Sequence, residues 1–224
     1  MGIKWNKVLV YLDISVPTLV LLIGIISFLL IKRTKLSFGD LVLFLFLAMQ
    51  VLLNGLGNYY QDHFVNNNWI YHLNCFLTIS LFCLYFYKSA FHKKEKNTII
   101  ALYFLFFFFF FLNILFIQNL KVFNSYSYAL GSFVLVLCVL SNFQRILSQL
   151  PTLNILGLKN FWINTGTLIY FGSCFFIFLS YRYLSIVSIK QVGILWKIHN
   201  VFLAVGCFVF LKAFLTRRWI VKSF

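Results

Sequence analysis

The sequence contains very few acidic residues, and this scarcity excludes whole classes of function. Its 224 residues include only Asp13, Asp40, Asp62 and Glu95, against 19 lysines and arginines. Acid–base chemistry at a pair of neighbouring carboxylates therefore has almost no suitable residues. Motifs of the GxSx kind and the HExxH zinc motif are also missing. We expect neither an enzyme nor a bound cofactor.

Cysteine is present but is not placed for disulfides or for metal binding. The five cysteines lie inside apolar stretches, and no two of them form a CxxC pair. Cysteine in such surroundings behaves as a small hydrophobic residue. Neither a disulfide framework nor a zinc site is therefore indicated.

Charged residues are scarce, whereas apolar residues are abundant. The chain is 62% hydrophobic and 10% charged, while soluble domains have about 45–50% and about 25%. A mean hydropathy of +0.93 over the whole length cannot be buried inside one small core. The composition predicts a multi-pass membrane protein.

The formal net charge of +15 does not indicate a nucleic-acid partner. The lysines and arginines lie mostly at the ends of apolar stretches, as in the segment 32–35. At such positions they anchor membrane helices to lipid headgroups and set the orientation of the helices. The expected partner is the lipid bilayer, with no nucleic acid.

Seven apolar runs are each long enough to cross a bilayer as a helix. A hydrocarbon core of about 30 Å needs around 20 residues in a helix, and backbone groups in lipid must be hydrogen-bonded internally. We therefore predict an all-α integral membrane protein, a seven-transmembrane-helix bundle forming a single domain over residues 1–224. The predicted helices cover residues 8–31, 40–60, 69–87, 98–117, 126–147, 161–181 and 193–215.

Positive charge is distributed unequally between the two sides that this topology defines. Cytoplasmic loops carry an excess of lysine and arginine. The side that holds the N-terminus has six of the 19: Lys4, Lys7, Lys121, Arg182, Lys190 and Lys197. We therefore expect the N-terminus outside and the C-terminus in the cytoplasm, in the cytoplasmic (inner) membrane.

The helix predicted over residues 98–117 is apolar all round. It contains six consecutive phenylalanines, 106–111. A helix without a polar face is surrounded by apolar material, so lipid contact is expected. Contact with a second copy of the chain, in a homo-oligomer, is the alternative.

Polar side chains recur at one depth near the predicted outer face. At 1.5 Å per residue, Asp13, His72 and His199 lie roughly 5–9 Å below the outer boundary. Asn54 and Asn200 add amides at this level, from the second and seventh helices. The same layer also receives Asn58 and Asn74, and Gln50 lies deeper. An ionisable residue within a span costs about 2.5–3.5 kcal/mol on insertion scales, so each is a functional hypothesis by default.

Two interpretations of this layer remain open. Asp13, His72 and His199 could form an outward-opening pocket for a small ligand, a lipid or a proton, since histidine titrates near neutrality. Two histidines and an aspartate could also bind zinc, but no local spacing fixes that geometry, and no metal site is predicted. Alternatively, these groups only link helices through hydrogen bonds worth about 0.6 kcal/mol per pair.

A second set of polar residues is expected at the inner face. Arg145 follows Asn142 by three residues, which places both on one helix face. We expect a cytoplasmic partner to contact Arg145, Lys159, Arg217 and Arg218, with headgroup contact as the alternative for Arg145.

Three residues are expected to shape single helices. Pro17 removes one backbone donor inside the first predicted helix, so a kink is expected there. Gly166 and Gly172 are expected to permit close helix packing in the sixth.

Three short motifs follow one another along the chain. They are Asn68–His72 (NWIYH), Phe161–Gly166 (FWINTG) and Trp196–Asn200 (WKIHN). In this order they resemble small, largely uncharacterised bacterial seven-helix proteins that are associated with sensor histidine kinases. The resemblance implies sensing and coupling to a kinase rather than catalysis, and it assigns no functional residue.

The first functional hypothesis is a sensory or signalling membrane protein. It would bind a small ligand, lipid or proton near the outer face and couple this to a cytoplasmic or membrane partner. A small-solute transporter or pore is the second hypothesis and needs polar residues near the midplane. The candidates for these are Gln50, Ser80, Asn164 and Ser173. The third is a structural subunit of a membrane assembly, docked through the phenylalanine-rich helix.

Overall fold

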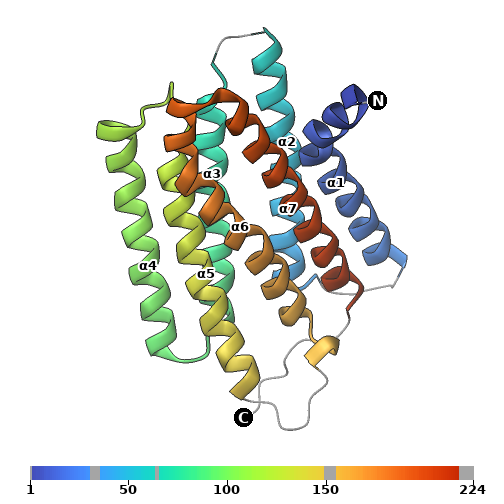
Figure 1. The fold of residues 1–224 in the computed structure, drawn as a ribbon. Coiled ribbons are helices and arrows are strands. Elements are labelled where there is room, and N and C mark those ends of the chain that lie inside the picture. Colours follow the sequence, from blue (N-terminus) through green and yellow to red (C-terminus); the bar gives the residue numbers. More distant parts are fainter. Residues whose placement is uncertain (1, 31–35, 64–65, 149–154, 217–224) are drawn as a thin grey trace.

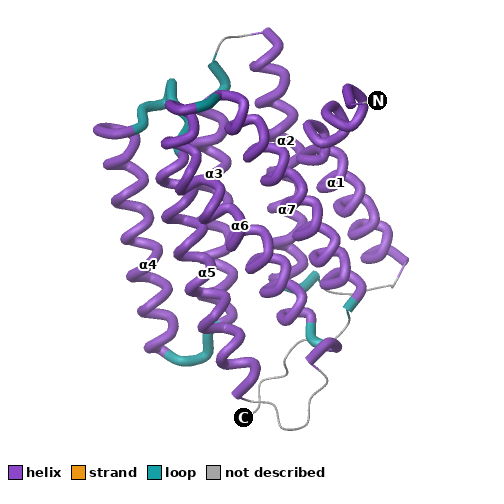
Figure 2. Tube along the Cα trace, in the orientation of Figure 1, coloured by secondary structure: helices purple, strands orange, loops and turns teal. Residues whose placement is uncertain are grey.

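Seven long helices make up almost the whole of the described chain. The structure is a computed structural model, and it describes residues 2–30, 36–63, 66–148 and 155–216. The helices are α1 (Gly2–Leu30), α2 (Phe38–His63), α3 (Asn68–Ser89), α4 (Lys93–Leu112), α5 (Ser125–Ser148), α6 (Lys159–Val187) and α7 (Ile189–Leu215). No strand occurs in these ranges (Figure 2). All seven helices are long and apolar enough to cross a membrane, which confirms the predicted multi-pass helical architecture.

The helices run up and down between two ends of the bundle (Figure 1). The odd-numbered helices begin at one end, termed the N-face, and the even-numbered helices begin at the other, termed the C-face. The N-face is the end that the sequence predicts to lie outside.

Two connections are shorter than the sequence predicts. The sequence predicts a loop over residues 182–191 between the sixth and seventh helices. In the structure α6 continues to Val187 and α7 begins at Ile189, so only Ser188 separates them. α4 begins at Lys93 rather than at residue 98. Lysine and glutamate are good helix formers, so a helix extends beyond its apolar span into a polar end segment. Hydropathy therefore gives only the minimum length of each helix.

α4 lies at one edge of the bundle (Figure 1) and packs mainly on α3 and α5. It is the least buried of the seven helices, as its uniformly apolar sequence predicts. Phe106 and Phe110 point into the bundle, whereas Phe104, Phe108 and Phe111 are exposed. The exposed rings form a surface that suits lipid.

Four interlocked phenylalanine rings fill the middle of the bundle. Phe46 of α2 lies 5.3 Å from Phe82 of α3 and 5.7 Å from Phe210 of α7, measured between ring centroids. Phe82 lies 5.3 Å from Phe171 of α6. All four side chains are buried. We term them the phenylalanine layer, and edge-to-face pairs of this kind contribute about 0.5–1.5 kcal/mol each beyond area burial.

The phenylalanine layer requires a close approach of α6 to α7. A Cβ added at Gly166 would lie 2.5 Å from Cε1 of Phe210, whereas a Cβ at Gly172 would meet nothing within 4 Å. On the facing helix, a Cβ at Gly206 would lie 3.1 Å from Cβ of Tyr170. The predicted packing role is confirmed for Gly166 and is wrong for Gly172, because Gly172 turns away from the helix interface.

We expect Gly166→Ala to lower the free energy of unfolding by about 1–3 kcal/mol, the usual effect of overpacking a filled core. The ring of Phe210 cannot move aside because Phe46 and Phe82 hold it. Gly172→Ala makes the same chemical change on the same helix and should be neutral or slightly stabilising. The measurement is unfolding in mixed detergent micelles, and equal destabilisation by the two variants would contradict the packing of Gly166.

Candidate functional site

A small polar cavity lies in the N-face half of the bundle, among α1, α2, α3, α5, α6 and α7. Its volume is about 10 Å³, which is room for about one water molecule. It is lined by Asp13, Gln50, Asn54, Tyr71, Asn74, Tyr128, Tyr170, Phe178, Trp196, His199 and Asn200. We term it the Asp13 cavity. An organic ligand does not fit in this space, whereas a water-sized species does.

Pro17 disrupts the backbone of α1 at the cavity. Proline has no N–H, so the carbonyl of Asp13, four residues earlier, loses its usual helical donor. Asn54 of α2 supplies a replacement, since its Nδ2 donates to the carbonyl of Asp13 at 3.2 Å. Nδ2 of Asn200, from α7, donates to the carbonyl of Leu9 at 3.1 Å. Two neighbouring helices thus hold the segment of α1 that carries Asp13, and Figure 1 shows α1 bent in its first half.

The side chain of Asp13 is 95% buried, with an exposed fraction of 5%. Its Oδ1 atom has no hydrogen-bond partner among the described residues. A buried carboxylate oxygen without a partner is strongly unfavourable when it is charged. This position therefore favours the uptake of a proton or of a small cation.

One wall of the cavity is a chain of side-chain amides. Oε1 of Gln50 accepts from Asn54 at 3.4 Å, and Nε2 of Gln50 donates to Oδ1 of Asn74 at 3.2 Å. The hydroxyl of Thr78 donates to the same oxygen at 2.9 Å. The chain links α1 through α2 to α3, and because its members are hydrogen-bonded to one another it forms a fixed wall.

The opposite wall is built around His199. Its Nδ1 donates to Oδ1 of Asn200 at 3.2 Å, which leaves Nε2 to accept from the hydroxyl of Tyr170 at 3.2 Å. The imidazole also stacks on Trp196, with centroids 5.3 Å apart, and lies against Phe178. Both ring nitrogens are therefore engaged, and His199 joins α6 to α7.

His72 does not line the Asp13 cavity, although it lies at a similar depth in the sequence. Its Nε2 donates to the carbonyl of Val122 at 3.0 Å, and its ring packs against Phe110. Because it points towards α4 and the segment before α5, His72 joins that segment to α3. Of the five predicted ligand-binding residues, Asp13, Asn54, His199 and Asn200 line one cavity and His72 does not.

A further polar cluster closes the N-face end of α4, and the sequence did not indicate it. Asn113 begins a π-helical turn, Asn113–Ile117. Its Nδ2 donates to Oε1 of Gln118 at 3.1 Å and to the hydroxyl of Ser127 at 2.8 Å. Gln118 in turn donates to Ser125 at 3.0 Å. The polar residues among 118–127, in particular Gln118, Asn119, Asn124 and Ser125, were the available signal for this helix end.

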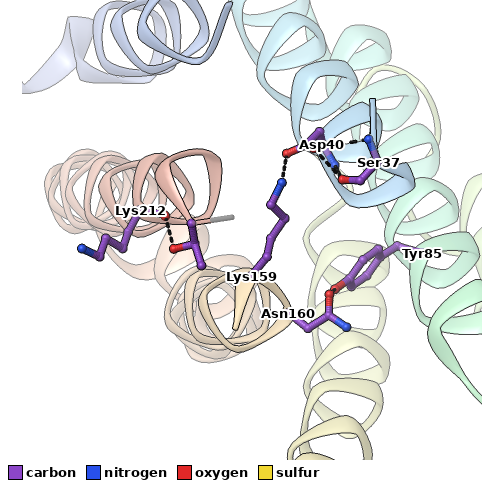
Figure 3. A network of polar contacts seen from close by, with 7 residues as sticks. Ser37, Asp40, Tyr85, Lys159, Asn160 and Lys212 are labelled. Carbon is purple, nitrogen blue, oxygen red and sulfur yellow. Dashed lines mark hydrogen bonds and ion pairs between the residues drawn. The ribbon is translucent and has the colours of Figure 1, made fainter. Parts of the chain in front are cut away.

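At the C-face, Asp40 and Lys159 form a buried ion pair (Figure 3). Nζ of Lys159 lies 2.5 Å from Oδ1 of Asp40, and both side chains are almost fully buried. The Ser37 hydroxyl donates to the other carboxylate oxygen of Asp40 at 2.5 Å. The backbone N–H of Asp40 donates to the hydroxyl of Ser37 at 3.1 Å, and the backbone N–H of Ser37 donates to that carboxylate oxygen at 3.3 Å. This reciprocal pair is a capping box at the start of α2.

The ion pair corrects the expectation that Lys159 faces a partner. Its side chain points to Asp40 of α2 and is 2% exposed. From the sequence alone Lys159 is predicted to be a surface charge, because its partner Asp40 lies 119 residues away along the chain.

Arg145 is also turned inward. Its guanidinium donates to the carbonyl of Ser89 at 2.5 Å and to Asn142 at 2.7 Å, and it lies 3.5 Å from Glu95. It also stacks over the ring of Phe91. Arg145 is therefore engaged with neighbouring side chains and backbone inside the bundle rather than on a free surface. The other two predicted partner-facing residues, Arg217 and Arg218, lie outside the described residues.

Comparison with known proteins adds no relative. The chain matches no family model, and no curated protein or solved structure is similar to it. The likeness to kinase-associated bacterial proteins therefore depends on the three short motifs alone.

Proposed function

We propose that this chain is a sensory membrane protein that takes up a proton or a monovalent metal cation at Asp13. The observation that carries the proposal is the unpartnered Oδ1 of Asp13, 95% buried beside a water-sized cavity. An ionisable residue held inside a membrane span is a functional-site hypothesis by default. The cavity excludes organic ligands by its size, which leaves the smallest positively charged species.

Oxygen atoms around the cavity support a hard monovalent cation or a proton. Gln50, Asn54 and Asn74 carry amide oxygens, which such cations prefer over nitrogen and sulfur. The titratable side chains that face Asp13 from the other helices are Tyr71, Tyr128, Tyr170 and His199. Asp13 is thus the one carboxylate among the lining residues.

Occupancy of Asp13 would change the packing of four helices. Asn54 holds the carbonyl of Asp13, and Asn200 holds the carbonyl of Leu9, one turn earlier in α1. Asn200 continues through His199 to Tyr170 of α6. Neutralising the charge of Asp13 would therefore alter the hydrogen bonds that position α1, α2, α6 and α7. The occupied and unoccupied states would then differ in their contacts, as a two-state change requires.

The excess of lysine and arginine at the C-face supports a cytoplasmic position for that face. In this orientation the Asp13 cavity lies in the outer half of the membrane, and the signal is read at the cytoplasmic ends of α6 and α7. The motif resemblance suggests a sensor kinase as the reader. Phe46, Phe82 and Phe210 lie on the C-face side of the cavity residues of their own helices, and this apolar packing favours sensing over transport.

Trp196 provides a direct test because it lines the cavity and stacks on His199. The other four tryptophans are replaced by phenylalanine, and the fluorescence of Trp196 in lipid nanodiscs is titrated separately with protons, Na⁺ and K⁺. We expect a saturable change with protons or with one of the metal cations. Asp13→Asn should weaken the apparent affinity by at least about tenfold, equivalent to 1.4 kcal/mol.

The matched control is Asp62→Asn, the same change at an exposed carboxylate of α2. It should leave the titration unchanged. The proposal is refuted if the fluorescence of the wild-type protein responds to no cation. It is also refuted if the Asp13→Asn variant titrates like the wild type. Cation flux into liposomes containing the protein alone would instead support a transporter.

A further inference from the structure

The start of α4 presents a basic segment at the C-face. Four lysines occur between residues 88 and 96, against the single acid Glu95. Lys93 and Lys94 are exposed and lie on the first helical turn. Backbone N–H groups at a helix start lack helical partners and carry a partial positive charge, and the side chain of His92 makes no capping hydrogen bond with described residues. This end of α4 therefore favours an anion.

A groove leads from this segment along the boundary between α4 and α5. Its volume is about 690 Å³, within the range of about 300–1,000 Å³ that ligand pockets occupy. Towards the C-face it is lined by His92, Lys94, Glu95, Thr98 and Ser141, and deeper in the membrane by Ile99, Leu102, Leu137 and Cys138. We term it the α4–α5 groove. Its charged mouth and apolar floor match a molecule with a charged head and an apolar tail.

A buried donor without an acceptor lies at the inner side of this groove. A smaller cavity, lined by Arg145 and Asn142, shares Glu95 and Ser141 with the groove. Arg145 is 92% buried, with 8% exposed, and its Nε has no hydrogen-bond partner among the described residues. A buried donor without an acceptor is unfavourable, so an oxygen atom that enters the smaller cavity from the groove would stabilise it.

We propose that the α4–α5 groove binds an anionic phospholipid. The phosphate lies at the first turn of α4 beside Lys93 and Lys94, and an ester oxygen accepts from Nε of Arg145. One acyl chain follows the apolar floor of the groove. Lipid has access to it, because α4 is the least buried helix and packs mainly on α3 and α5.

Charge complementarity selects this occupant over the alternatives. Each lysine near a membrane surface attracts anionic lipid by about 1 kcal/mol, or about fivefold in affinity. A zwitterionic lipid brings its own positive group to a segment that is already cationic. An apolar helix of a second chain would cover the floor but would leave the lysines and Nε of Arg145 without a partner. This site is separate from the Asp13 cavity and does not depend on its function.

Native mass spectrometry of the full chain in detergent tests the proposal. The protein is mixed with equal amounts of phosphatidylglycerol and phosphatidylcholine carrying the same acyl chains. We expect phosphatidylglycerol adducts to predominate. The double variant K93Q/K94Q should weaken their formation by about fivefold for each lysine, whereas Lys121→Gln, at an exposed lysine of the N-face, should not.

A second variant tests the acyl-chain part of the groove without changing charge. Thr98→Trp fills the groove and should remove most phosphatidylglycerol adducts, while Phe108→Trp on the exposed face of the same helix should not. Equal binding of the two lipids would overturn the proposal. The proposal would also be overturned if K93Q/K94Q and Lys121→Gln lost phosphatidylglycerol adducts equally, or if Thr98→Trp and Phe108→Trp kept equal amounts of these adducts. Displacement of the lipid by soluble glycerol phosphate would overturn it as well.

Discussion

Replacement of Lys159 by methionine is expected to lower the free energy of unfolding by about 3–5 kcal/mol, the usual result of breaking a buried ion pair from one side. The ammonium of Lys159 lies 2.5 Å from the carboxylate of Asp40, and neither side chain is more than 3% exposed. Methionine keeps the volume but removes the ammonium group that balances the buried charge of Asp40. Asp40 also caps α2 through Ser37, so the start of α2 should loosen.

Lys121→Met removes an exposed lysine and should change the unfolding free energy by less than about 0.5 kcal/mol. The double variant D40N/K159M removes both charges and keeps a side-chain oxygen that can cap α2. It should be more stable than Lys159→Met alone, because the buried carboxylate charge is removed together with the ammonium that balanced it. The measurement is unfolding in mixed micelles. If the losses of unfolding free energy caused by D40N and K159M simply add in the double variant, the two residues do not act as a pair.

The number of helices was predictable because the bilayer fixes their minimum length. Their ends were less predictable, since charged residues such as Lys93 and Glu95 form helix as readily as loop. The side of the membrane that each end faces stays a prediction from charge alone.

The depth of a polar residue could be counted from the sequence, but its direction could not. His72 and Asp13 lie at similar depths, yet His72 turns to Val122 and Asp13 turns to the cavity. Direction depends on which helices are neighbours, and seven runs of similar length do not encode that order. Asp40 and Lys159, 119 residues apart, illustrate the same limit. The capping box of Ser37 and Asp40 was the one local signal that Asp40 belongs to a structured helix start.

We expect Phe82→Ala to lower the free energy of unfolding by about 3–5 kcal/mol, as large cavities in packed cores do. Phe82 is the ring of the phenylalanine layer that touches the other three members, with centroids 5.3 Å from Phe46, 5.3 Å from Phe171 and 6.2 Å from Phe210. Lipid cannot enter this position to fill the cavity, and in a membrane the contacts between helices come mainly from such packing.

Phe108→Ala is the matched control, because it deletes the same ring from the exposed face of α4, where 63% of the residue is accessible. Lipid chains replace the lost contacts there, so the unfolding free energy should change by less than about 0.5 kcal/mol. The measurement is unfolding of both variants in mixed micelles. If Phe82→Ala is no more destabilising than Phe108→Ala, the four rings do not form a packed layer. A large difference between them would show that the four rings form a packed layer in the middle of the bundle.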